Sequence, residues 1–63
     1  MERQDENLRE AARLAQETMD KCDAFIGESS DDGCRAIYSS IKEMMAQHKS
    51  RLQQELAQHA AER

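Results

Sequence analysis

The sequence predicts an all-α protein, a helical hairpin in which two helices fold back on each other around one short loop. Three observations lead to this class. Apolar residues recur at alternating intervals of four and three along both halves of the chain, which is the period of one face of an α-helix. Proline is absent from the 63 residues, and the two glycines, Gly27 and Gly33, both lie near the middle. The remainder is rich in strong helix formers, and no stretch shows the two-residue alternation of a strand.

The first helix is expected over residues 3–26. Gly27 follows it at the position where a left-handed glycine commonly ends a helix. The face of this helix that we expect to meet the second helix carries Leu8, Ala12, Ala15, Met19, Cys22 and Ile26.

A loop over residues 27–30 and a second helix over residues 30–61 complete the single domain, residues 1–63. Ser29, with Asp32 three residues later, matches the Ser-x-x-acid pattern that begins many helices. The inner face predicted for this helix carries Cys34, Tyr38, Ile41, Met45, His48 and Leu52.

Folding the chain at this loop pairs Leu8 with Leu52 and Cys22 with Tyr38. Each helix also carries apolar residues beside its inner face, so that about three positions in seven are apolar, as in a helical bundle. One hairpin leaves a side of this stripe uncovered, which predicts a homodimeric four-helix bundle or a helical protein partner. The residues that we expect to form this interaction seam are Leu8, Met19, Ile26, Ile41, Met45 and Leu52. Accordingly, Ile41→Asp is expected to abolish assembly and most of the helicity.

Composition excludes several classes of protein. No apolar run is long enough to span a membrane, and the acidic N-terminal residues lack the apolar stretch of a signal peptide, which predicts a cytoplasmic protein. Two cysteines are too few for a disulfide framework or a four-ligand zinc site. Gly-rich phosphate loops and nucleophile elbows are absent from the sequence. We therefore expect no enzymatic activity, cofactor, metal or small-molecule substrate.

The cysteines and histidines have ordinary structural interpretations. In the expected pairing, Cys22 and Cys34 lie too far apart to bridge, so both are expected to be buried thiols, with a redox role as the alternative. His48 is expected in the seam, opposite Ala12. His59 lies eleven residues further along, about 16 Å away on the same helix, so the two histidines cannot share a metal ion.

Charge divides unevenly along the chain. Residues 1–32 hold ten acidic and four basic side chains, whereas residues 33–63 hold three and five. Arg35, Lys42 and Lys49 lie seven residues apart and form one stripe on the second helix. This stripe either pairs with acids of the first helix, such as Asp23 and Glu17, or follows the phosphates of a nucleic acid.

In length, loop position and the spacing of its inner faces, the chain resembles the Rop family of plasmid regulators. That resemblance implies a hairpin that dimerises into a four-helix bundle and binds RNA. The family contacts RNA through Lys, Asn, Phe, Gln and Lys on its first helix. The corresponding positions of this chain carry Arg3, Glu10, Leu14, Thr18 and Phe25. Only the first of them, Arg3, is still a basic residue.

The chain also resembles, more loosely, the small co-chaperones of type III secretion needle subunits, which are helical hairpins that bind partner helices. The function that the sequence favours is a non-enzymatic protein–protein interaction, as a regulator, adaptor or chaperone subunit. A Rop-like RNA-binding hairpin and a needle co-chaperone are the alternatives.

Overall fold

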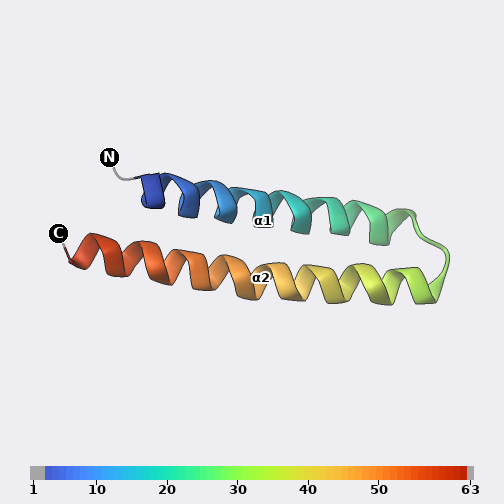
Figure 1. The fold of residues 1–63 in the computed structure, drawn as a ribbon. Helices are drawn as coiled ribbons and strands as arrows, with labels where there is room; N and C mark the ends of the chain where they lie inside the picture. Colours follow the sequence, from blue (N-terminus) through green and yellow to red (C-terminus); the bar gives the residue numbers. More distant parts are fainter. Residues whose placement is uncertain (1–2, 63) are drawn as a thin grey trace.

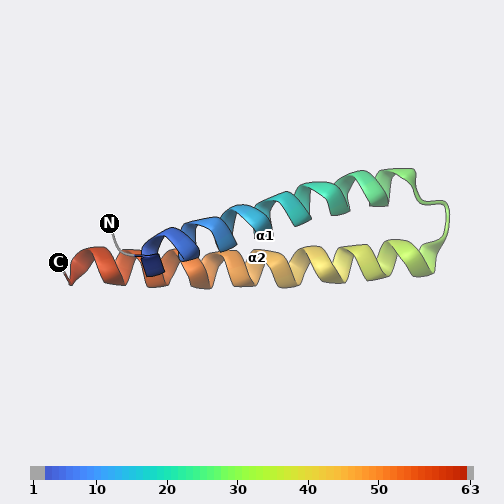
Figure 2. The same ribbon diagram turned by 45° about the horizontal axis from the view of Figure 1, so that its top comes forward.

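The computed structural model describes residues 3–62, which form two antiparallel helices joined by a short loop (Figure 1). Helix α1 spans Arg3–Glu28 and helix α2 spans Asp32–Ala61. The helices lie side by side in both ribbon views, with the ends of the chain together opposite the loop (Figures 1 and 2). The resulting rod measures 49 × 15 × 11 Å. The predicted all-α helical hairpin is confirmed.

Helix α1 runs two residues past its predicted end. Gly27 does not have the positive φ of a helix-ending glycine, and it lies within the helix. The last turn is closed instead by the amide of Ser29, which donates to the carbonyls of Phe25 and Ile26 at 3.0 and 3.4 Å. Glycine adopts negative φ as readily as positive φ, so a glycine at position 27 does not by itself end the helix.

Helix α2 begins with Asp31 as its N-cap, not with Ser29 as the sequence pattern suggested. The amide of Cys34 donates to Oδ2 of Asp31 at 2.7 Å, which satisfies one of the free amides of the first turn. This bond holds the pKa of the Asp31 carboxyl below its usual value. The Ser29 hydroxyl accepts from the amide of Asp31 and donates to its carbonyl within the loop, so it is not available as a cap.

The hydrophobic core of the hairpin is small. In the described chain, the only buried apolar residues are Ala15 and Cys22, both on α1, and α2 has no fully buried residue. The inner face of α2 is half-buried and consists of Tyr38, Ile41, Lys42, Met45, Lys49, Leu52, Leu56 and His59.

This inner face is rotated by one residue from the predicted one over part of α2. Lys49 is half-buried, while His48 and Cys34, both expected to be inside, are exposed. A lysine can occupy such a position because its aliphatic stem packs while its ammonium group reaches a polar partner at the edge. Lys42 and Lys49 both do so, as described below.

The two helices are also paired about one helical turn away from the predicted alignment. Lys42 pairs with Asp23 and so lies close to Cys22. The predicted alignment had placed Tyr38, and not Lys42, opposite Cys22. Side chains lean toward the N-terminus of their own helix, and this direction shifts which residues meet. In addition, the start of α2 projects beyond the end of α1 at the loop (Figure 1).

Candidate interaction face

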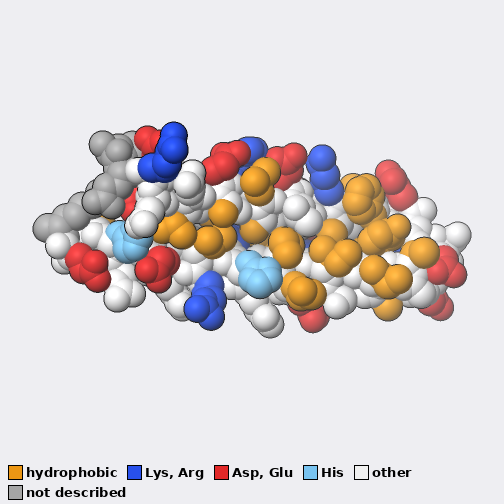
Figure 3. Space-filling model, viewed as in Figure 1, with side chains coloured by type: hydrophobic (Ala, Val, Ile, Leu, Met, Phe, Trp, Pro, Cys, Tyr) orange, Lys and Arg blue, Asp and Glu red, His pale blue; other side chains and the backbone are white. Residues whose placement is uncertain are grey.

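One side of the hairpin presents apolar side chains from both helices to solvent. The largest of these are half exposed or more: Leu14 at 49%, Phe25 at 44%, Ile37 at 59% and Met44 at 50%. Figure 3 shows orange side chains gathered on this side across both helices. We call it the open face, and it consists of Ala11, Leu14, Thr18, Phe25, Ile37, Ile41, Met44 and His48.

The open face has the spacing of a second helix-packing seam. On α2 its members are separated by four, three and four residues, the same intervals that form the inner face. On α1, Leu14 and Phe25 are eleven residues apart, or about three turns, and so project in nearly the same direction. The hairpin therefore uses one seam internally and leaves a second seam uncovered.

Apolar residues are not evenly distributed along this face. In the half nearer the loop, the rings of Phe25 and Tyr38 lie 5.4 Å apart at a tilt of 52°, with Ile37 exposed nearby on α2. Toward the chain ends, the same side combines apolar and polar side chains. There a shallow hollow of about 470 Å³ is lined by Gln4, Asn7, Leu8, Ala11, Glu55 and His59. The open face thus carries its aromatic rings in the loop half, whereas Glu55 and His59 lie beside Leu8 and Ala11 in the terminal half.

The opposite edge between the helices is closed by polar contacts. Nζ of Lys42 lies 2.5 Å from Oδ1 of Asp23, and this pair raises the pKa of Lys42. Nζ of Lys49 donates to Oε1 of Gln16. These two lysines therefore face α1, and the predicted pairing with Asp23 is confirmed.

The remaining members of the predicted basic stripe behave differently. Within residues 3–62, Arg35 is exposed and makes no ion pair with α1. Glu17, expected to pair across the helices, instead pairs along its own helix with Arg13 and Lys21 at 3.0 and 3.5 Å. Such pairs at spacings of four support α1 itself and do not set how the helices align.

The terminal end of the hairpin contains a buried carboxylate that the sequence did not reveal. Asp5 is only 2% exposed, and its Oδ1 lies 2.8 Å from Nδ1 of His59. The other ring nitrogen, Nε2, lies 3.2 Å from Oε2 of Glu55. The sequence offered no signal for this cluster, because Asp5 and His59 come together only through the observed alignment of the helices.

The cysteines are free thiols in different environments. Cys22 is buried and Cys34 is exposed, so the expectation of two buried thiols is correct only for Cys22. A hydrogen bond with Asp31 raises the pKa of the Cys34 thiol, whereas a reactive redox cysteine needs a lowered one. In the part of the chain that is described, no cluster of histidine, cysteine and acidic side chains could hold a metal ion.

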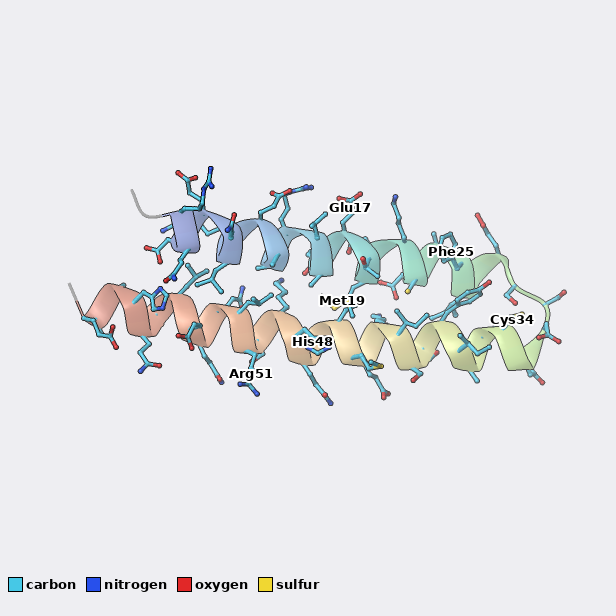
Figure 4. All side chains as sticks on the ribbon, in the orientation of Figure 1. Glu17, Met19, Phe25, Cys34, His48 and Arg51 are labelled. Carbon is cyan, nitrogen blue, oxygen red and sulfur yellow. The ribbon has the colours of Figure 1, made fainter. Side chains whose placement is uncertain are left out.

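The six residues predicted as an interaction seam lie between the two helices of the hairpin itself. All are half-buried, and Met19, for example, projects into the space between α1 and α2 (Figure 4). Ile41 also borders the open face. These residues therefore form the internal seam of the hairpin, and the second seam lies beside it.

The chain matches no protein-family model, no curated protein and no solved structure. Over residues 3–62, neither helix contains a stretch apolar enough to cross a membrane.

Proposed function

We propose that this protein is a non-enzymatic interaction protein that works as a homodimer, in which two hairpins pair through their open faces into a four-helix bundle. The observation that carries this proposal is the second seam, with Leu14, Phe25, Ile37 and Met44 exposed along it. Exposed apolar patches of this kind typically mark protein interaction sites. A helix from a second hairpin has the matching spacing to cover them.

The exposed area of the hairpin is consistent with one missing partner. The chain exposes 4813 Å². A compact monomer of its mass, 7.2 kDa, is expected to expose about 4100 Å². The excess of about 700 Å² is close to the roughly 800 Å² that each partner buries in a standard interface. Covering the open face would therefore bring the chain to the exposure of an ordinary folded protein.

RNA binding through the basic stripe has less support. Lys42 is paired with Asp23, and Lys49 is bonded to Gln16. A nucleic acid would have to compete with both partners, which leaves Arg35 as the exposed base of the three. We therefore favour a protein partner over a phosphate backbone.

Sedimentation equilibrium or light scattering of the purified chain over a range of concentrations tests this proposal. We expect twice the 7.2 kDa mass of one chain. Ile37→Asp should give a monomer, because it places a charge at the most exposed apolar position of the open face. Circular dichroism should show that this variant keeps its helices, since the hairpin itself buries little of Ile37.

Ala36→Asp is the matched control. Ala36 is also exposed, but it precedes Ile37 and lies about 100° around the helix, away from the open face. This variant should remain dimeric. A monomeric parent chain, or an Ile37→Asp variant that still dimerises as tightly as the parent, overturns the proposal.

A further inference from the structure

We infer that the two hairpins of this dimer pair with their loops at the same end, around a two-fold axis parallel to the helices. This inference rests on the proposed homodimer and adds its geometry. Two face-to-face arrangements have two-fold symmetry. In one, the axis runs along the rod, so the loops lie together and α1 of each copy packs on α2 of the other. In the second, the axis runs across the rod, so the loops lie at opposite ends and like helices pack together.

The uneven distribution of apolar residues along the open face favours the first arrangement. Three of the four large exposed apolar side chains, Phe25, Ile37 and Met44, lie from the middle of the rod toward the loop, and the fourth, Leu14, lies near the middle of α1. With the loops together, these residues of one copy meet the same residues of the other. With the loops apart, they would lie against the terminal half, where Glu55 and Arg51 carry charge. Burying those charges against apolar side chains is unfavourable.

The charges of the two helices favour the same arrangement independently. Helix α1 carries seven acidic and four basic side chains, whereas α2 carries three and four. With the loops together, each acidic α1 packs against an α2 whose charges nearly balance. With the loops apart, α1 packs against α1, and two acidic helices face each other. Charge complementarity of this kind selects between otherwise similar pairings.

The edges of the open face show this complementarity at particular residues. In Figure 4, Glu17 projects from the outer edge of α1 and Arg51 from the opposite edge, on α2. Rotation around an axis along the rod exchanges these edges. It therefore brings the edge of α2 that carries Arg51 against the edge of α1 that carries Glu10 and Glu17, which are both about half exposed and share Arg13 as an ion-pair partner.

Cys34 reports directly on the arrangement. It is exposed in the first turn of α2, at the loop end of the rod. With the loops together, the two Cys34 thiols lie at the same end of the bundle. With the loops apart, they are separated by most of the 49 Å length of the rod. Cys22 is buried and does not compete for a thiol reagent.

The experiment is crosslinking of the full chain with a short bis-maleimide. The parent chain is compared with Cys34→Ser and with the monomeric Ile37→Asp variant as controls. We expect a covalent dimer from the parent chain alone. A third chain carries Cys34→Ser and Gln58→Cys, which moves the exposed thiol to the terminal end of α2, and it is mixed with the parent chain.

Loops at the same end predict crosslinks between like chains and none between the parent and the Gln58→Cys chain. Crosslinks only between unlike chains mean that the loops lie apart, which overturns the inference and leaves the homodimer intact. A dimer that gives neither product also overturns it. The absence of any dimer in sedimentation is a different result, because it overturns the proposed function itself.

Discussion

Nδ1 of His59 lies 2.8 Å from Oδ1 of Asp5, although 54 residues separate them in the chain. This contact joins the beginning of α1 to the last turn of α2, far from the loop that links the two helices. Ends of helices tend to fray, because their last turns have few packed neighbours. The Asp5–His59 contact therefore holds closed the end of the hairpin that has no covalent connection.

His59→Ala should destabilise the hairpin by about 1–3 kcal/mol, because Asp5 then keeps a buried carboxylate without its imidazole partner. Asp5→Ala alone should have an effect of similar size. In the double variant, the losses should not add, since neither group is left behind. Urea unfolding of the four chains measures this cycle. Simple additivity of the two losses would mean that the contact contributes nothing.

Asp31→Ala should destabilise α2 at neutral pH, because the amide of Cys34 loses its acceptor. The pKa of Asp31 is lowered in the folded chain, so its cap contributes fully above the pKa of the unfolded state. That contribution is lost as pH falls through the lower, folded pKa. Thermal unfolding should thus separate the parent and variant at pH 7 and bring them together in strong acid. A constant difference in Tm across this range would contradict the assignment.

The two glycines should respond differently to alanine. Gly27 lies within α1, and a β-carbon there would meet nothing within 4 Å, so Gly27→Ala should stabilise the chain by about 0.5–1 kcal/mol. At Gly33 the added carbon would lie 3.2 Å from Oδ2 of Asp31, the oxygen that caps α2. Gly33→Ala should gain less than Gly27→Ala, because the cap must shift. Chemical denaturation of both variants provides the comparison, and equal gains would be the contrary result.

His48→Leu should strengthen the proposed dimer. His48 lies near the middle of the rod as the last α2 residue of the open face, where it places a polar ring at the end of an apolar spacing. Replacing it by leucine should lower the dimer Kd about tenfold, equivalent to about 1.4 kcal/mol. Gln47→Leu serves as the control, because it adds the same side chain at an exposed position one residue away. A similar effect in both variants would indicate nonspecific association through added apolar surface, and not pairing through the open face.

Much of the hairpin could be predicted from residue pattern alone. The break near Gly27 and the helical spacing on both sides of it are local features, and the structure reproduces them. Helix ends were less predictable, because Ser29 and Asp31 both offer a capping oxygen. Geometry within the loop decided between them, with the Ser29 hydroxyl bonded inside the loop and Asp31 bonded to the first turn.

The inner face of α2 shows most clearly where sequence reasoning failed. One stripe of this helix contains Ile41 and His48, and the neighbouring stripe contains Lys42 and Lys49. Hydropathy favours the first stripe as the inner one. In the folded chain, the lysines line the inner face because their stems pack inside while their ammonium groups reach Asp23 and Gln16. His48 is consequently turned outward onto the open face, while Ile41 stays half-buried at its border.

By itself, the sequence determined that two amphipathic helices form and where the chain turns between them, since both depend on interactions between residues close in the chain. Only the tertiary structure decided how α1 and α2 align and which stripe of α2 faces inward. Those choices depend on contacts between residues far apart, such as Asp5 with His59 and Asp23 with Lys42. The difference in free energy between neighbouring alignments of the two helices comes from such contacts. A repeating pattern of apolar residues gives nearly the same burial in each alignment, so it does not select one of them.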